Sequence, residues 1–366
     1  MQLEKYTISR DERWYHAWPD LTLASDGALL CVFNECTHHC NRSHTRLMLC
    51  RSEDRGRTWS PKAPLTEATD GLPYYYNCPR ISRLRDGRLA IVCDRIPAAG
   101  EQFSEQAVNV LWLSGDNGKT WAAPVEIPLR GIVPDKLCEL ETGRWLFAAQ
   151  QPLDGRWSEY LCYSDDQGKN WSAPVLVASD PALKLCEVSM LPLGGGTIAA
   201  FLRENSQLGY DCQKTISHDN GETWGPVTPF PLPGCHRPVA GLLQDGRVFI
   251  TFRFCQGGAG GMGNGAQNFF AAVTDRRAVL ASTRNQARVR IIPIDYDSAP
   301  KADTGYSGWI QFPDGALYIA NYIVDDQLER GQIRGYALRL DHAAPARPCA
   351  CCPTLNKCGL CGDNPE

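Results

Sequence analysis

Four side chains that could bind an acidic ligand stand beside short apolar runs, in the order Glu187, Arg203, Arg253 and Tyr306. Glu187 directly precedes Val-Ser-Met-Leu, which is an unusual position for a solvated carboxylate. Arg203 and Arg253 each end an apolar segment, and a guanidinium can hold both oxygens of a carboxylate at once. We expect these groups to meet at one site if the fold brings their segments together.

A second group of reactive side chains lies in the segment 34–44, which contains Glu35, His38, His39, His44 and two cysteines. A carboxyl or an imidazole can give a proton to a leaving group if it has the reach and a suitable pKa. The imidazoles and thiols could instead bind zinc, but adjacent histidines on a loop follow no ligand-spacing rule. We expect proton transfer, substrate contact or an ordinary loop here, with no metal and no cofactor.

The elements that position these groups are repeated. The pattern Ser-x-Asp-x-Gly-x-Thr-Trp occurs at 52–59, 114–121, 164–171 and 217–224, with Asn in place of Thr in the third copy. Its starts are 62, 50 and 53 residues apart (114−52, 164−114, 217−164), and self-similarity at about 50 residues is typical of a propeller or a solenoid. In each copy Asp can bond its own backbone, Gly supplies positive φ and Trp packs against the turn. We therefore interpret the copies as structural turns.

A second repeat consists of an apolar run, a glycine turn and another apolar run. Its six copies span 19–27, 79–87, 136–143, 187–195, 238–246 and 306–315. Six hairpins predict an all-β, six-bladed propeller of four-stranded antiparallel blades over residues 1–340. The stretch from Leu3 to Arg10 is expected to supply the outer strand of the last blade and so close the ring. The fifth blade keeps only a trace of the eight-residue pattern, at 272–277.

Composition argues against several classes of function. The chain has 43% apolar and 21% charged residues and a formal net charge of −4. There is no basic surplus for nucleic acid and no apolar run of about 18 residues for a membrane span. The first residues, 1–6, have no signal-peptide pattern. Most of the 17 cysteines stand singly in predicted strands, a usage typical of buried reduced thiols, so we expect a cytoplasmic protein.

The tail, 341–366, differs in composition from the rest of the chain. It contains two Cys-x-x-Cys pairs, Cys349/Cys352 and Cys358/Cys361. This is zinc-ligand spacing, although the five residues between the pairs leave little room for a tetrahedral site. We expect a loosely ordered tail with reactive thiols.

The eight-residue pattern resembles the Asp-box of sialidase-like β-propellers, the BNR repeat, and the resemblance extends to about Leu340. It implies a glycoside hydrolase with a tyrosine nucleophile, activated by a glutamate, because a carboxylate on the anomeric carbon would repel an anionic nucleophile; such enzymes are exceptions to the two-carboxylate rule. By this resemblance Tyr306 corresponds to the nucleophile and Glu187 to its partner. Arg203 and Arg253 correspond to two of the three arginines that hold the substrate carboxylate.

Two features of that family are missing. The Phe/Tyr-Arg-Ile-Pro-like motif of the first blade is replaced by His16-Ala17-Trp18-Pro19-Asp20, which keeps the proline and lacks the arginine. Arg80 or Arg237 could supply that guanidinium. The loop that should carry the acid/base Asp contains none, so the candidate acids are Glu35, Asp20, Asp94 or a histidine such as His38. His39 and Trp18 are expected to contact the substrate.

We therefore expect an exo-acting, retaining glycoside hydrolase that cleaves a terminal acidic sugar, either sialic acid or a related keto-sugar acid. The missing arginine leaves a uronic or deoxy sugar open. A catalytically silent propeller that binds glycans or proteins is one alternative, since fold does not imply function. A propeller-fold polysaccharide lyase or hydrolase that acts on uronic acids is another. The enzyme hypothesis requires Glu187 and Tyr306 to meet at the propeller mouth, with arginines opposite.

Overall fold

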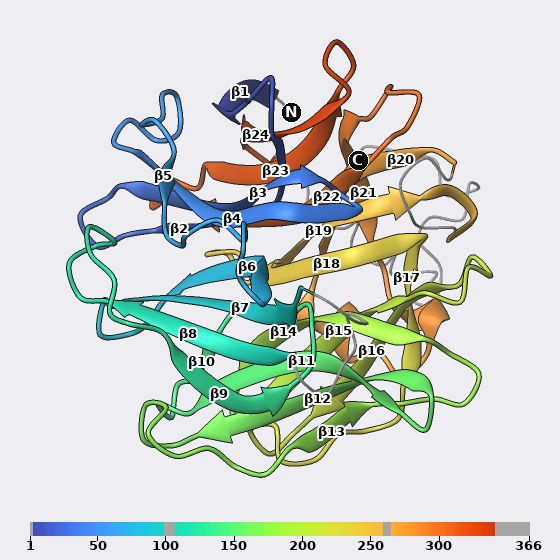
Figure 1. Cartoon of the computed structure of the whole chain (residues 1–366). Helices are drawn as coiled ribbons and strands as arrows, with labels where there is room; N and C mark the ends of the chain where they lie inside the picture. Colours follow the sequence, from blue (N-terminus) through green and yellow to red (C-terminus); the bar gives the residue numbers. More distant parts are fainter. Residues whose placement is uncertain (1–2, 99–106, 259–264, 341–366) are drawn as a thin grey trace.

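The computed structural model describes residues 3–98, 107–258 and 265–340. In these ranges the strands form six separate four-stranded antiparallel sheets, arranged as the blades of a ring (Figure 1). The predicted all-β, six-bladed propeller is confirmed.

Each blade is built from strands that follow one another in the chain. Blades 1 and 2 comprise β2 (Tyr15–Leu23), β3 (Leu29–His38), β4 (Asn41–Ser52), β5 (Ala63–Pro64), β6 (Tyr74–Arg83), β7 (Leu89–Pro97), β8 (Val108–Ser114) and β9 (Val125–Arg130). Blades 3 and 4 comprise β10 (Cys138–Glu139), β11 (Trp145–Leu153), β12 (Arg156–Ser164), β13 (Val175–Ala178), β14 (Leu185–Gly194), β15 (Thr197–Glu204), β16 (Asp211–Ser217) and β17 (Thr228–Pro233). Blades 5 and 6 comprise β18 (Cys235–Leu242), β19 (Val248–Cys255), β20 (Gln267–Thr274), β21 (Arg290–Tyr296), β22 (Thr304–Gln311), β23 (Leu317–Asp325) and β24 (Arg330–Leu338), with β1 (Leu3–Ser9) at the edge.

The N-terminal strand closes the ring. β1 pairs antiparallel with β24, with Leu3 opposite Leu338, and becomes the outermost strand of blade 6. The last blade is thus assembled from both ends of the propeller, as the sequence predicts. First strands of neighbouring blades contact one another, among them β2 with β6 and with β22, so they form the inner wall of the ring.

The four repeated turns share one set of hydrogen bonds. In the first, the Gly56 amide donates to Ser52 Oγ (2.8 Å), the Thr58 amide donates to Asp54 Oδ1 (2.9 Å) and Trp59 Nε1 donates to the Gly56 carbonyl (3.1 Å). The other three copies repeat the serine and aspartate bonds. Gly56 has φ +86°, which explains the fixed glycine. In blade 5 the turn is replaced by helix α1 (Arg276–Leu280), which Asp275 caps by accepting from the Ala278 amide.

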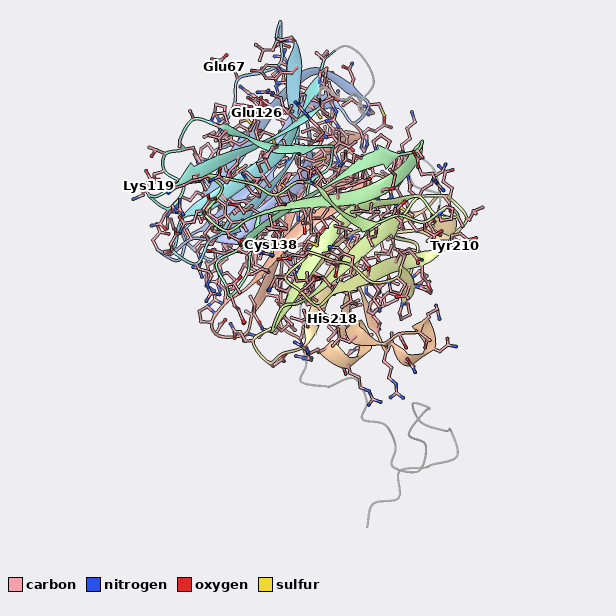
Figure 2. All side chains as sticks on the ribbon, turned by 90° about the horizontal axis from the view of Figure 1, so that it is seen from below. Glu67, Lys119, Glu126, Cys138, Tyr210 and His218 are labelled. Carbon is pink, nitrogen blue, oxygen red and sulfur yellow. The ribbon has the colours of Figure 1, made fainter. Side chains whose placement is uncertain are left out.

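The core consists of apolar clusters that join neighbouring blades; one, for example, combines Phe201 and Phe230 with Phe252. Cysteines contribute to it: within the described ranges Cys40 is exposed, Cys138 is half-buried and the other cysteines are buried. Few large apolar side chains are exposed, and one of them, Tyr210, lies at the edge of the molecule (Figure 2). None of the helices in the described part of the chain has the length and hydropathy needed to cross a bilayer. The two Cys-x-x-Cys pairs lie outside the described residues.

Candidate active site

Every blade bends its inner strand at one equivalent residue. Six non-glycine residues, one per blade, have φ between +43° and +54° at this bend: Trp18, Cys78, Val133, Glu187, Arg237 and Tyr306. In five blades the strand pairing shifts register at this point, which defines a β-bulge. Positive φ is uncommon for such residues and tends to occur at functional sites. We call these six residues the bulge ring.

The bulge ring faces the centre of the propeller. Trp18, Cys78, Val133 and Tyr306 belong to one buried cluster although they come from four blades. The Arg237 guanidinium lies 5.5 Å from the Tyr306 ring. The six side chains therefore converge at one mouth.

A second set of buried polar residues surrounds the bulge ring. Next to each bulge, the adjacent strand presents a polar side chain, and these are Asn34, Asp94, Gln150, Arg203, Arg253 and Tyr322. All six are buried. Buried polar groups require hydrogen-bond partners, which a ligand can supply. The convergence of these six side chains on one mouth therefore indicates a binding site and not an apolar core.

Glu187 and Tyr306 meet at this mouth. The Tyr306 hydroxyl donates to Glu187 Oε1, and Arg203 Nη1 donates to the same oxygen at 2.6 Å. Burial acts to raise the pKa of Glu187, but the charges of three arginines, Arg203, Arg253 and Arg237, outweigh it and hold the pKa below its usual value. Burial, and then the charge of Glu187, raise the pKa of Tyr306. The pair is thus a neutral phenol bonded to an ionised carboxylate that can accept its proton.

The arginines beside this pair retain unused donors. Arg203 Nη2 donates to Asn205 Oδ1 (2.6 Å), and Arg253 donates to the Thr304 carbonyl (3.3 Å). The Nε atoms of Arg203 and Arg253 are buried without a hydrogen-bond partner in the described part of the chain, as is Glu187 Oε2. A buried N–H group without an acceptor is costly, so this arrangement suits an anionic ligand.

Arg80 and Arg237 are engaged by the backbone. Arg237 donates to the carbonyls of Val133 (3.4 Å) and Pro134 (2.7 Å), and so connects blade 5 to blade 3. Arg80 donates to the Pro19 carbonyl (3.3 Å) and the Ser307 carbonyl (3.1 Å), which join blade 2 to blades 1 and 6. Both side chains tie inner strands together, and the Nε atom of Arg237 is buried without a hydrogen-bond partner in the described ranges. That Arg80 or Arg237 replaces the missing first-blade arginine stays a prediction.

Two carboxyls that the sequence offers as acids are engaged in ion pairs. Asp20 is buried, accepts from the Ile81 amide (3.0 Å) and lies 3.4 Å from Arg80 Nε. Glu35 is buried and ion-paired with Lys62 (2.5 Å) and Arg46 (2.7 Å). Burial acts to raise the pKa of Glu35, but hydrogen bonds from His16, Lys62 and Arg46 lower it far below its usual value. The lowered pKa of Glu35 does not suit a proton donor.

Lys62 also accounts for a cluster with metal-ligand geometry. Ligand atoms of Asp11, His16 and Glu35 lie within 4.8 Å of one another. The Lys62 ammonium lies 2.5 Å from each carboxylate and 3.1 Å from His16 Nε2. It therefore supplies the positive charge that a metal would bring.

The histidines of the segment 34–44 point to different partners. His44 stacks on Trp14 (3.8 Å between ring centres) and faces Glu35. The half-buried His38 lies against the Tyr15 ring, and burial lowers its pKa. His39 places Nδ1 2.5 Å from Asp303 Oδ2. These imidazoles do not form one ligand set.

Three residues at the mouth were given no functional role by the sequence, or only a weak one. The Arg42 guanidinium lies 3.8 Å over the Trp18 ring, and Asp303 accepts from His39. Burial raises the pKa of Asp94 to about 6, and its Oδ1 has no partner in the described ranges. Position in the sequence offered a signal for two of them: Arg42 shares a segment with His39, and Asp303 lies three residues before Tyr306.

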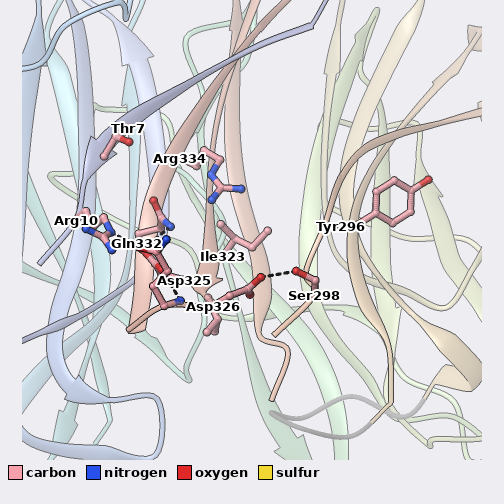
Figure 3. A pocket seen from close by; sticks show the side chains of 11 residues that line it. Thr7, Arg10, Tyr296, Ser298, Ile323, Asp325, Asp326, Gln332 and Arg334 are labelled. Carbon is pink, nitrogen blue, oxygen red and sulfur yellow. Dashed lines mark hydrogen bonds and ion pairs between the residues drawn. The ribbon is translucent and has the colours of Figure 1, made fainter. Parts of the chain in front are cut away.

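A separate pocket of about 500 Å³ lies outside the bulge ring, at the edge of blade 6 (Figure 3). Its charged groups are paired with one another or with neighbours: Arg10 with Asp325, Arg334 with Asp295 and Ser298 with Asp326. The charged groups of this pocket thus already have partners in the protein. The pocket therefore gives weaker evidence for a bound ligand than the mouth does.

Fold and mouth together define a sialidase-like six-bladed propeller. The BNR repeat-like domain family matches residues 77–319, and the chain belongs to this family. Comparison with curated proteins gave no match.

Several solved structures share the fold at low identity. A protein of unknown function from Dyadobacter fermentans is 21% identical, with a TM-score of 0.74, over 92% of this chain and 98% of the other. The Hadza microbial sialidase Hz136 is 16% identical (TM-score 0.67; 92% and 68% covered). An α-L-arabinanase from Penicillium chrysogenum, complexed with arabinobiose, is 15% identical (TM-score 0.64; 93% and 99% covered). At these identities the likeness concerns the fold.

Proposed function

We propose that the protein is an exo-acting, retaining glycoside hydrolase that removes a terminal acidic sugar, with Tyr306 as its nucleophile. The observation that carries the proposal is the hydrogen bond from Tyr306 to Glu187, formed between two bulge-ring residues that are 119 positions apart in the chain. A sialidase and an intramolecular trans-sialidase share the fold, which supports this reaction class by analogy.

The substrate carboxylate would bind to the arginines beside this pair. Arg203 and Arg253 each have a buried Nε–H without a partner in the described ranges, and a guanidinium matches the geometry of a carboxylate. We propose Arg42 as a third cation. It contacts Cys36 Sγ (3.4 Å) and stacks on Trp18, and has no carboxylate partner in the described part of the chain. It would provide the first-blade guanidinium that the inner strand lacks.

The phenol suits an anomeric carbon that carries a carboxylate, because a neutral nucleophile can approach it without charge repulsion. As Tyr306 Oη bonds to that carbon, the phenolic proton passes to Glu187 Oε1, which already accepts it in a hydrogen bond. The departing oxygen keeps the bonding electrons and requires a proton from a third group. Water then attacks the same carbon, Tyr306 leaves and recovers its proton, and two inversions give retention. Sialic acid and related keto-sugar acids have this chemistry.

The test is turnover of a panel of aryl glycosides of acidic and neutral sugars. We expect hydrolysis of an acidic sugar by the wild type and a loss on the order of 10⁴-fold or more in Tyr306→Phe, the scale at which nucleophile removal acts. Tyr318→Phe is the matched control: it deletes another buried tyrosine hydroxyl of blade 6, bonded to the Gly56 carbonyl, and should retain activity. Turnover that survives Tyr306→Phe would contradict the assigned nucleophile. Absence of turnover with glycan binding intact would favour a binding propeller.

A further inference from the structure

A buried carboxylate, Asp303, stands beside the mouth and binds an imidazole. Its Oδ2 accepts from the Tyr15 hydroxyl (2.7 Å) and lies 2.5 Å from His39 Nδ1. Its Oδ1 accepts from the Tyr322 hydroxyl (2.8 Å) and lies 3.8 Å from Arg253 Nη1. Burial acts to raise the pKa of Asp303, but the charge and hydrogen bond of His39 and the charge of Arg253 lower it. Asp303 is thus a fixed anion that holds His39 from one side.

His39 is held at the mouth with one nitrogen available. Nδ1 is engaged by Asp303, whereas Nε2 has no hydrogen-bond partner in the described part of the chain. The ring meets the Trp18 ring edge-on, with 5.2 Å between centres, and about a quarter of the side chain (26%) is exposed. An imidazole fixed on one nitrogen by a carboxylate, with the other nitrogen unpartnered on a partly exposed ring, has the arrangement of a general acid and base.

The position of the His39–Asp303 pair fits the reaction. Asp303 lies three residues before Tyr306, and it contacts Arg253, whose guanidinium lies 5.6 Å from the Tyr306 ring. His39 reaches Asp303 from the β3–β4 connection of blade 1, so it approaches the nucleophile from another blade. Two competing carboxyls are engaged by cations: Glu35 is ion-paired with Lys62 and Asp20 with Arg80.

We infer that His39 protonates the leaving group and later deprotonates the attacking water, with Asp303 as its positioning residue; this inference rests on the proposed glycosidase function. The His39 imidazole thus takes the acid/base role of the aspartate that is missing from the segment 34–44. Trp18, the bulge-ring residue of blade 1, fixes the ring from the side.

The two steps balance. In the first, the bond from the anomeric carbon to the leaving oxygen breaks with its electron pair on oxygen, and that oxygen takes the Nε2 proton of the His39 imidazolium. Tyr306 Oη bonds to the carbon and its proton passes to Glu187. In the second, neutral Nε2 takes a proton from water, the water oxygen bonds to the carbon and Tyr306 leaves with the proton from Glu187. Asp303 remains ionised and accepts from Nδ1 throughout.

The test is the dependence of the hydrolysis rate on the leaving group, with aryl glycosides of graded phenol acidity. An acidic phenol leaves without protonation, so the kcat/KM of His39→Ala, which reports the first step alone, should match the wild type on it and fall about 10²–10⁴-fold on the least acidic phenol, the usual contribution of general acid catalysis. Azide, which needs no base, should restore deglycosylation in His39→Ala. Asp303→Asn should show the same leaving-group dependence, which a merely structural defect would not produce.

His38→Ala is the matched control, because it removes the adjacent imidazole, which packs on Tyr15 and has no carboxylate partner among the described residues. It should lose far less than His39→Ala on poor leaving groups. If His39→Ala does not fold, His39→Gln provides the same comparison. An equal loss of kcat/KM on every leaving group, or a loss in His38→Ala as large as that in His39→Ala, would overturn the role of His39. The proposed function would still stand if Tyr306→Phe abolished turnover. Inactivity of the wild type on every acidic glycoside would instead refute the proposed function, and the role of His39 with it.

Discussion

Replacing Glu187 with glutamine should cost the protein both stability and activity. The carboxylate is buried among Arg203, Arg253 and Arg237, and its charge compensates theirs. Glutamine keeps an oxygen for the Arg203 bond but leaves the three buried cations without this anion. Removing one member of a buried ion pair typically costs about 3–5 kcal/mol. We expect the free energy of unfolding to fall by about 3 kcal/mol, because the acceptor oxygen remains.

The assay is urea unfolding of the wild type, Glu187→Gln, Arg203→Met and the double variant. The double variant should lose less than the sum of the single losses, because each single substitution leaves a buried charge unpaired. The pH dependence has a definite sign. The pKa of Glu187 is lower in the folded protein, so its contribution is complete above the unfolded value of about 4.3 and is lost as the pH falls through the folded value. The wild-type and Glu187→Gln stabilities should therefore converge in acid.

Tyr306→Phe gives the contrasting result. It deletes one hydrogen bond and no charge, so it should cost only about 1 kcal/mol of stability while turnover collapses. The charge argument would be refuted if Glu187→Gln unfolded at the wild-type urea concentration, or if its stability deficit were the same at pH 3 as at pH 7. Additive losses in the double variant would show that Glu187 and Arg203 are not energetically coupled.

Further predictions concern the surroundings of the site. Burial raises the pKa of Asp94 to about 6, so its ionisation opposes folding as the pH rises through that value; Asp94→Asn should match the wild type near pH 4 and be more stable above pH 6, by up to about 3 kcal/mol. Gly305 has φ +120° and a Cβ there would lie 2.8 Å from Arg253 Cβ; Gly305→Ala should lose about 1–3 kcal/mol in urea unfolding and raise KM. Lys62→Met leaves Glu35 with less compensation and should cost about 3 kcal/mol at neutral pH and less in acid.

The fold could be predicted because its signals are local and repeated. Each eight-residue turn contains its own hydrogen-bond partners, and each hairpin is marked by a glycine between apolar runs, so counting them gives the six blades. Closure by β1 follows from the lack of an outer strand in the last blade. The exception is blade 3, where β10 covers only Cys138–Glu139; there the predicted inner strand is mostly irregular although Val133 keeps the bend.

The site could be predicted only in part, because residue type does not reveal burial or partners. Arg80 and Arg237 have the same chemistry as Arg203, yet only the fold shows that they donate to backbone carbonyls. Glu35 looks like a proton donor in the sequence, whereas Lys62 and Arg46, which come from two different segments of the chain, hold it as an anion.

The bulge ring explains how one scaffold gathers different chemical groups at one point. A positive φ at a non-glycine residue costs on the order of 1–3 kcal/mol, and the protein has such a residue in every blade. The bend directs one side chain per blade toward the mouth, so the local backbone is conserved among blades while the side chain differs: glutamate in blade 4, arginine in blade 5, tyrosine in blade 6. In blade 1 the bend presents Trp18, against which Arg42 and His39 pack. Blade 1 thus contributes these polar groups from the β3–β4 connection and the start of β4, and not from its inner strand, which is why a search for an arginine in that strand does not find one.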